Sequence, residues 1–193
     1  MDNLIIPKDA FSHGQIRSKL WLSENFARWS QKHLDFSESF ELNWYGSWVG
    51  IGPFLMLENC KLDIKKLTLF DLTPSHLEIS KFVLDFWRCE SLEIVTKQID
   101  VNEHEPDSKP NQIFVNSSCE HMSDLWIKKL PQNSYVLAQS TNMEHSEHIN
   151  RSLDLKDFAS KYADSLQILE TNQIDFNYPD KSFSRFMLFG IRK

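Results

Sequence analysis

Side chains that could transfer protons gather in the segment "IFVNSSCEHM", residues 113–122. Carboxylates and imidazoles titrate in ranges that suit general base catalysis, so Glu120 and His121 are the candidate catalytic residues. The alternative is that both occupy the first turn of an ordinary helix, with Ser118 as its N-cap. The sequence alone leaves both interpretations open.

A second polar cluster lies in "QSTNMEHSEHIN", residues 139–150. His145 and His148 are three residues apart and are flanked by Glu144 and Glu147, a spacing compatible with a metal site. No third ligand is specified, however, and the H-E-x-x-H motif is absent. We therefore expect no metal here and interpret the segment as a polar loop at a pocket mouth, where it could determine substrate specificity.

Glycine is concentrated in "GSWVGIG", residues 46–52, which holds three of the chain's five glycines. Glycine allows a sharp turn and lets the backbone approach a ligand or a helix closely. The dinucleotide spacing G-x-G-x-x-G is absent, and Trp48 would crowd a pyrophosphate. A turn needed for packing and a loop that approaches a ligand both remain possible.

Two acids end later β-like runs. Asp71 closes "LTLFD", and a carboxylate there can accept hydrogen bonds from both hydroxyls of a ribose. Asp100 closes "KQID", where a carboxylate or an adjacent amide could contact an adenine amino group. The alternative for each is an ordinary loop acid. Together with the glycines, the two acids predict a nucleoside pocket.

These candidates lie where short β-like runs end, in a chain that alternates β-like and helix-like segments. The expected strands are residues 40–46, 66–71, 91–99, 111–118, 133–141, 166–176 and 183–193. The expected helices are residues 14–34 (one or two helices), 52–60, 73–87, 118–130 and 152–163. Thr73 followed by Pro74, and Ser152, are the expected helix starts.

Strands that alternate with helices predict βαβ units and a mostly parallel sheet with helices on both faces. The linker "NYPDKS" fits a hairpin, so the last of seven strands should run antiparallel to its predecessor. We expect an N-terminal helical extension over residues 1–39 and an α/β domain over residues 40–193. Ligands bind beyond the carboxyl ends of such strands.

Composition excludes several functional classes. The chain has 193 residues, a net charge of −6 and a pI near 5.6, so nucleic acid is disfavoured as the main partner. Cys60, Cys89 and Cys119 are too widely spaced for a disulfide framework, which favours a reducing compartment. The segment "MDNLIIPKDAF" is unlike a signal peptide, and no apolar run is long enough for a membrane span. We expect a cytoplasmic protein.

Taken together, these features resemble the class I S-adenosylmethionine-dependent methyltransferases over roughly residues 40–193. The resemblance rests on "GSWVGIG", "LTLFDLTP", "KQID", "FVNSSCEHM" and the terminal hairpin. It implies a Rossmann-like fold and S-adenosylmethionine as the cofactor. The glycine loop departs from the family's commoner G-x-G-x-G.

The resemblance also implies which residues bind that cofactor. Asp71 would bind the ribose hydroxyls, and Leu72 would flank the adenine. Asp100, with Val101 beside it, matches the acid of the third strand. Asn116 begins the polar segment that faces the transferred methyl group. The methionine part of the cofactor would lie against Gly46, Ser47, Trp48 and Gly50.

The function implied is methyl transfer to a small molecule or a protein side chain. The tetrapeptide of amino-directed nucleic-acid methyltransferases is absent, because Asn116 is followed by Ser-Ser-Cys. Two alternatives remain. The same cofactor could serve lyase chemistry or aminocarboxypropyl transfer, or the chain could be an inactive binding subunit with this fold.

Overall fold

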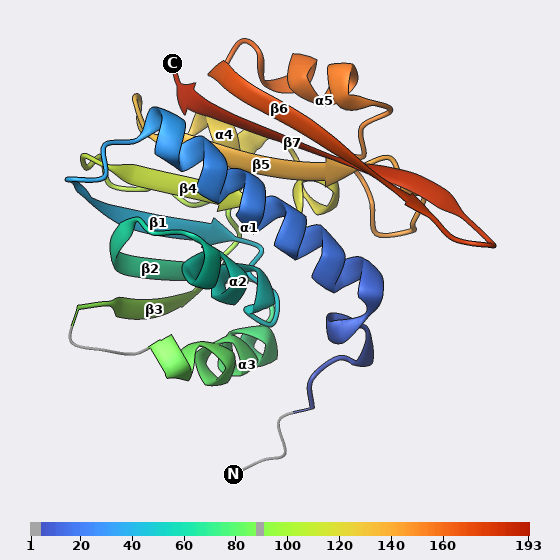
Figure 1. Ribbon diagram of the computed structural model, residues 1–193, viewed down its shortest axis with the longest axis horizontal. Coiled ribbons are helices and arrows are strands. Elements are labelled where there is room, and N and C mark those ends of the chain that lie inside the picture. Colours follow the sequence, from blue (N-terminus) through green and yellow to red (C-terminus); the bar gives the residue numbers. More distant parts are fainter. Residues whose placement is uncertain (1–4, 88–90) are drawn as a thin grey trace. The chain divides into compact units, whose positions relative to one another are not determined.

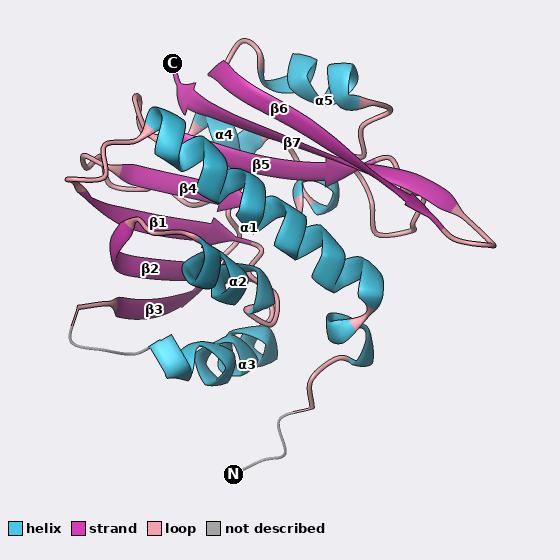
Figure 2. Cartoon of the chain, in the orientation of Figure 1, coloured by secondary structure: helices cyan, strands magenta, loops and turns pink. Residues whose placement is uncertain are grey.

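The computed structural model describes residues 5–87 and 91–193. The chain forms two compact units, Met1–Asp100 and Val101–Lys193. Each unit combines β-strands with helices, as Figures 1 and 2 show. The boundary expected between residues 39 and 40 separates an N-terminal helical extension from an α/β domain, and it stays a prediction.

The first unit has three parallel strands in the order β3-β2-β1. Trp44 of β1 lies opposite Leu69 of β2, and both are buried. Helix α1 packs against α2, so the predicted N-terminal helical segment is one helix. The elements are η1 (Lys8–Phe11), α1 (His13–His33), β1 (Ser39–Tyr45), α2 (Ile51–Asn59), β2 (Asp63–Asp71), α3 (Pro74–Leu84), η2 (Asp85–Trp87) and β3 (Glu93–Gln98).

Local sequence explains where two helices of this unit begin. The Ser12 side chain accepts a hydrogen bond from the Gln15 amide and caps α1. Pro74 is at the first position of α3, where its missing N–H costs nothing. Thr73 precedes it as predicted, but its hydroxyl makes no capping hydrogen bond. The predicted position of the helix start is therefore confirmed, but the expected capping hydrogen bond to the Thr73 side chain is absent.

The second unit has four strands in the order β4-β5-β7-β6. Strands β4 and β5 are parallel, whereas β7 is antiparallel to both β5 and β6. The terminal hairpin is therefore confirmed, and the last strand lies between β5 and β6. The elements are β4 (Gln112–Asn116), η3 (Cys119–His121), α4 (Leu125–Lys128), β5 (Tyr135–Thr141), α5 (Leu155–Tyr162), β6 (Leu166–Asn177) and β7 (Ser182–Arg192).

The predicted helix over residues 118–130 is wrong in this unit. It is divided into η3 and α4, and Met122 between them is extended. Ser123 donates a hydrogen bond to Asn102 and accepts one from the Leu125 amide. Short polar side chains that bond elsewhere compete with helix formation, and this competition interrupts the helix.

The predicted cap of the last helix is also wrong. The side chain of Asp154, not Ser152, accepts the hydrogen bond from the Asp157 amide at 2.7 Å. Ser152 is fully buried, and its amide bonds to the Thr141 carbonyl. Aspartate and serine are comparable caps, so the tertiary bond to Thr141 decides between them.

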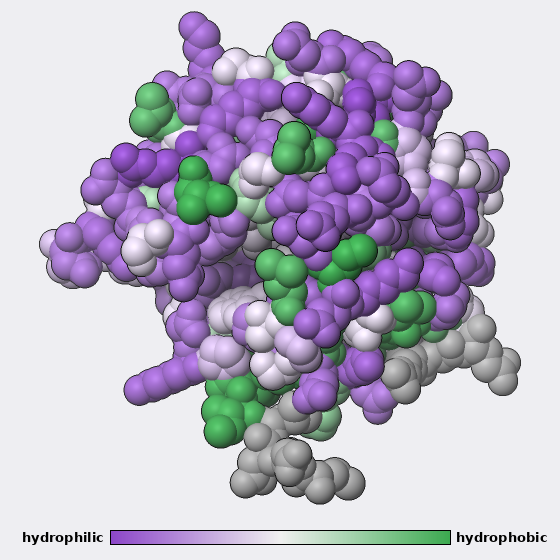
Figure 3. All heavy atoms as spheres, turned by 180° about the vertical axis from the view of Figure 1, so that it is seen from behind, coloured by the Kyte–Doolittle hydropathy of each residue, from purple (hydrophilic) through white to green (hydrophobic). Residues whose placement is uncertain are grey.

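These observations confirm the expected fold class, an α/β fold with seven strands and the last strand antiparallel. Within residues 5–87 and 91–193, no helix has the length and apolar character needed to cross a membrane. The face drawn in Figure 3 is mainly hydrophilic, with hydrophobic residues in small separate groups. Cys60 and Cys119 are free thiols, and Cys89 lies outside the described residues.

Candidate functional site

The loop between β1 and α2 has an unusual backbone. Gly46, Trp48 and Gly50 have φ angles of 64°, 48° and 81°, all in the left-handed region. Glycine adopts this region freely, but a bulky residue such as tryptophan does so at a cost of about 1–3 kcal/mol. Strain of this kind is kept only where the surroundings enforce it, and it is often found at functional sites.

Hydrogen bonds within the unit enforce this conformation. The Ser47 amide donates to the Phe70 carbonyl at 3.0 Å, and the Gly50 amide donates to the Ser47 carbonyl at 3.0 Å. The Ser80 hydroxyl donates to the Trp48 carbonyl at 2.6 Å. The loop is thus attached to both β2 and α3.

Two glycines of the segment have a packing role. A Cβ atom at Gly50 would lie 3.0 Å from Cα of Ser80. A Cβ atom at Gly52 would lie 2.7 Å from Cζ2 of Trp44, whose ring is buried. The packing interpretation therefore accounts for Gly50 and Gly52, and Gly46 provides the turn.

Asp71 lies at the end of β2, as predicted, and holds this loop. Its Oδ2 accepts a hydrogen bond from the Trp48 amide at 2.8 Å. Its Oδ1 accepts one from the Thr73 amide at 2.9 Å and lies 3.2 Å from Nδ1 of His76. Only 11% of the side chain is exposed. The carboxylate therefore joins the two loops that follow β1 and β2.

The side chains of Trp48 and Ser47 differ in what they contact. The Trp48 ring packs against a buried cluster that includes Val49 and Ile79, and Nζ of Lys19 lies 5.0 Å from the ring centroid. The Ser47 hydroxyl is buried without a hydrogen-bond partner among the described residues. Ser47 is therefore the loop side chain with capacity left for a ligand.

Leu72 and Asp100 lie near Asp71 at neighbouring strand ends. Asp71 pairs with Gln98 in the sheet, and the Ile99 amide donates to the Asp71 carbonyl at 3.3 Å. Leu72 is 63% exposed, which is unusual for a large apolar side chain. Asp100 is partly buried. Val101, the first residue of the second unit, is buried.

Asn116 ends β4 in the second unit, and its side chain shapes the turn that follows. Its Oδ1 accepts a hydrogen bond from the Ser118 amide at 3.0 Å, and its Nδ2 lies 3.0 Å from Sδ of Met122. The Cys119 thiol contacts the Asn116 carbonyl, and burial raises the pKa of this thiol. Asn116 is fully buried, so its amide group serves this turn.

Glu120 is a buried carboxylate with one of its two oxygens unused. Oε1 lies 3.4 Å from Nη1 of Arg185, and the side chains are 3% and 11% exposed. Oε2 is buried and has no hydrogen-bond partner within the described residues. A buried polar oxygen without a partner is costly in a protein interior, so Oε2 is a candidate for contact with a ligand.

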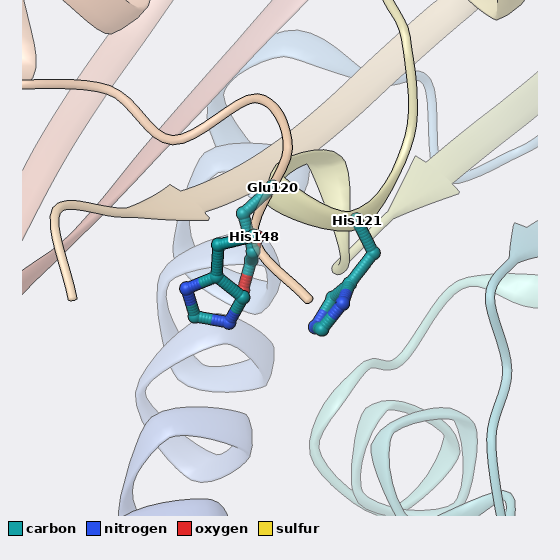
Figure 4. A group of neighbouring side chains, drawn as sticks. All are labelled: Glu120, His121 and His148. Carbon is teal, nitrogen blue, oxygen red and sulfur yellow. The ribbon is translucent and has the colours of Figure 1, made fainter. Parts of the chain in front are cut away.

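Two histidines lie beside this carboxylate. The rings of His121 and His148 have their centroids 4.8 Å apart at an interplanar angle of 87°. Figure 4 shows Glu120, His121 and His148 directed into one region, from the segment after β4 and the loop after β5. Desolvation lowers the pKa of His121 from its usual range, which favours the neutral ring.

The loop carrying His148 is fixed at its far end. Asn150 donates to the Met122 carbonyl at 3.0 Å and to Oδ1 of Asp124 at 2.9 Å. The Tyr162 hydroxyl donates to the same Asp124 oxygen at 2.7 Å, and Nζ of Lys161 donates to Oδ1 of Asn150 at 3.0 Å. Helix α5 thereby anchors the loop to the Glu120–His121 segment.

The sequence prediction had grouped His148 with its neighbours in the loop. Glu144 instead pairs with Arg151 at the surface, and His145 and Glu147 are exposed. His148 is the functional candidate that the prediction missed as a partner of Glu120 and His121. This grouping could have been predicted, because β4 and β5 are adjacent parallel strands and the segments that follow them begin at the same edge of the sheet.

A separate cavity of about 400 Å³ lies at the opposite ends of β4 and β5. Lys109, Asn111, Asn133 and Tyr135 contribute to its lining. Ligands of open α/β sheets bind at the carboxyl ends of strands, so this cavity is not the expected substrate site.

Comparisons with solved structures identify the fold. The N-methyltransferase NodS from Bradyrhizobium japonicum WM9, solved with S-adenosyl-L-homocysteine, matches with a TM-score of 0.62 and 13% identity; the match covers 96% of this chain and 92% of NodS. The magnesium protoporphyrin IX methyltransferase ChlM from Synechocystis PCC 6803, also solved with this product, has a TM-score of 0.66 and 9% identity, with 95% and 87% covered. The predicted resemblance to class I methyltransferases is confirmed at the level of the fold.

Comparisons of sequence add nothing to this finding. No family model matches the chain, and no curated protein does.

Proposed function

We propose that this protein is an S-adenosylmethionine-dependent methyltransferase that acts on a small molecule or a protein side chain. The observation that carries the proposal is the likeness of its fold to methyltransferases solved with that cofactor or its product. The residues that follow β1 and β2 have the chemistry that this cofactor needs.

Asp71 is suited to hold a ribose although it already has partners. Two carboxylate oxygens offer about four lone-pair sites. The amides of Trp48 and Thr73 and the ring of His76 use three of them. One site is left for a ribose hydroxyl, and rotation of the partly exposed His76 ring would free another. The carboxylate is thus fixed in place before the ligand arrives.

Leu72 and Ser47 supply further proposed contacts to the cofactor. The exposed Leu72 side chain can cover one face of an adenine ring, and this contact would bury apolar surface that is otherwise exposed to water. The buried Ser47 hydroxyl can bond to the polar amino-acid end of the cofactor. Gly46, Trp48 and Gly50 shape the loop, and the partly buried Asp100, which follows β3 in the same unit, is a further proposed cofactor contact.

In the proposed reaction the protein mainly positions the reactants and need not form a covalent bond to either of them. When bound, S-adenosylmethionine supplies a methyl group activated by a sulfonium. The chain must align an acceptor lone pair with that carbon and remove a proton where the acceptor carries one. Glu120 and His121 are the proposed bases, since a carboxylate oxygen without a partner and a neutral imidazole can each accept a proton.

Calorimetry of cofactor binding tests the proposal. Leu72→Ser removes the proposed adenine contact without altering the buried core, and Leu153→Ser is its matched control, with 72% of the side chain exposed. We expect saturable binding of S-adenosylmethionine, weakened about tenfold by Leu72→Ser and unchanged by Leu153→Ser. Absence of heat at high cofactor concentration would falsify the proposal.

A second candidate is a binding subunit without activity. The amides of Ser47, Trp48 and Gly50 are bonded within the chain, so these three are not available to a ligand, which favours this candidate. Mass spectrometry of the purified protein distinguishes the two. A co-purifying nucleoside would count against the inactive subunit, and formation of S-adenosylhomocysteine instead of methylthioadenosine on incubation with S-adenosylmethionine would exclude lyase chemistry.

A further inference from the structure

The orientation of His148 makes one of its ring nitrogens available to a ligand. Nδ1 lies 2.8 Å from the Met143 carbonyl oxygen, which can only accept a hydrogen bond. Nδ1 must therefore carry the proton, and in the neutral ring the lone pair is on Nε2. A backbone carbonyl that fixes the histidine tautomer in this way is the usual support of a metal-binding imidazole.

The buried carboxylate beside this ring has the complementary property. Arg185 lies against Oε1 of Glu120, which leaves Oε2 buried and without a described partner. Figure 4 shows the carboxylate directed toward His148. If Glu120 served only to pair with Arg185, a bidentate contact would satisfy both oxygens. The single long contact leaves one oxygen for another cation.

We propose that Glu120, His121 and His148 bind a divalent first-row transition-metal ion. One ligand atom from each residue lies within 4.8 Å of the other two. Tetrahedral coordination at 2.0–2.1 Å requires ligand atoms about 3.4 Å apart, so the side chains must close around the ion. His121 is the least buried of the three residues and is the one placed to make that movement, whereas Glu120 pairs with Arg185 and His148 bonds to the Met143 carbonyl.

The ligand set decides the class of ion. Two imidazoles and one carboxylate suit Zn²⁺ and other first-row transition metals, whereas Mg²⁺ prefers oxygen ligands. Three protein ligands also leave at least one coordination position open, as in catalytic zinc sites. Arg185 partly balances the carboxylate charge and orients it.

The open position gives the ion a possible role, which rests on the proposed methyl transfer. An acceptor hydroxyl bound there would lose its proton more readily, because a metal ion lowers the pKa of a bound oxygen ligand. Glu120 and His121 would then act as metal ligands instead of free bases. The metal site itself does not depend on that role.

The test measures metal binding alone on the full chain, after removal of metals with a chelator. Calorimetry with ZnCl₂, MnCl₂ and MgCl₂ should show one Zn²⁺ per chain, weaker Mn²⁺ and the weakest affinity for Mg²⁺. His148→Ala and His121→Ala should each weaken Zn²⁺ binding at least about tenfold. His145→Ala is the matched control, because its ring lies 5.3 Å from that of His148 but outside the ligand set.

Three outcomes would overturn the proposal. They are no Zn²⁺ binding, unchanged affinity in both His148→Ala and His121→Ala, or equal loss in His145→Ala, which would indicate an adventitious surface site. Thermal unfolding of each variant verifies folding, and the exposed His121 keeps the test valid if His148→Ala is unstable. Cofactor binding to the metal-free protein is measured separately, so failure of the metal site and failure of the methyltransferase proposal give different results.

Discussion

The glycine loop of the first unit and the Glu120–His121–His148 cluster of the second differ in how many of their polar groups are hydrogen-bonded within the chain. In the glycine loop, three amides and the Asp71 carboxylate are bonded within the chain, and the Ser47 hydroxyl is the buried exception. In the cluster, one oxygen of Glu120 is buried without a described partner, and Nε2 of His148 is the ring nitrogen left for a ligand.

This difference suggests a structural role for the loop and a ligand-binding role for the cluster. Bonded polar groups define a backbone shape, and the loop uses them to hold Trp48 in a strained conformation. A polar atom left without a partner adds nothing to the shape and costs stability, which makes the unpartnered Glu120 oxygen beside two histidines a candidate for ligand contact. Substitutions in the loop should therefore mainly affect folding, and those in the cluster should mainly affect binding.

The largest effect is expected at Gly50. Gly50→Ala forces a left-handed φ of 81° on alanine and places a Cβ atom 3.0 Å from Ser80. The free energy of unfolding should fall by roughly 2–4 kcal/mol, measured by denaturant titration. Gly14→Ala, in the first turn of α1, is the control and should cost nothing. A tolerated Gly50→Ala would show that the loop is not held rigidly.

The next effect is expected at Asp71. Asp71→Asn keeps the shape of the side chain but replaces one acceptor oxygen by a donor, which faces a backbone amide or the ring of His76. Unfolding free energy should fall by about 1–3 kcal/mol, whereas Asp164→Asn at an exposed position should change little. Equal stabilities of the two variants would contradict the assigned role of Asp71 in the loop.

A smaller effect is expected at the helix that anchors the His148 loop. Asp154→Ala removes the cap of α5 and should lower the unfolding free energy by about 1 kcal/mol. Ser152→Ala should be neutral or slightly stabilising, because the buried Ser152 hydroxyl has no described partner. If Ser152→Ala melted at a lower temperature than Asp154→Ala, Ser152 would be the cap instead.

The smallest effect on stability is expected at His121. The residue is exposed, so His121→Ala should change the unfolding free energy by no more than about 0.5 kcal/mol while Zn²⁺ affinity falls. Parallel denaturation and calorimetry on one preparation compare the two quantities. A loss of stability similar to that of Asp71→Asn would remove the distinction between the two regions.

The strand pattern was sufficient to predict most of the fold. Alternating strands and helices placed Asp71 at a strand end and Glu120 in the segment that follows the fourth strand, because hydrophobic periodicity is local information. The partners of Asp71 were not predictable, since they depend on left-handed conformations at Gly46, Trp48 and Gly50. Sequence shows that glycine permits such angles, but it does not show that tryptophan adopts one.

The predictions that failed depend on contacts between distant segments. Ser123 bonds to Asn102, 21 residues away, and Asp124 bonds to Asn150 and Tyr162, 26 and 38 residues away. These bonds to distant residues compete with the expected helix. The same contacts bring His148 beside Glu120. Neither effect leaves a local pattern. The loop by itself therefore showed two histidines without a third ligand, and no metal site was predicted there.

The position of β7 affects how the second unit folds. A tight turn at residues 178–181 joins β6 to β7, so this hairpin can form early from local contacts. Its β7 edge must then pair with β5, whose last residue is more than 40 positions earlier. Closing such a long loop is entropically costly, so docking of the hairpin should limit the folding rate. Until docking is complete, β5 and β7 both expose an unpaired edge, and the chain is then most vulnerable to aggregation.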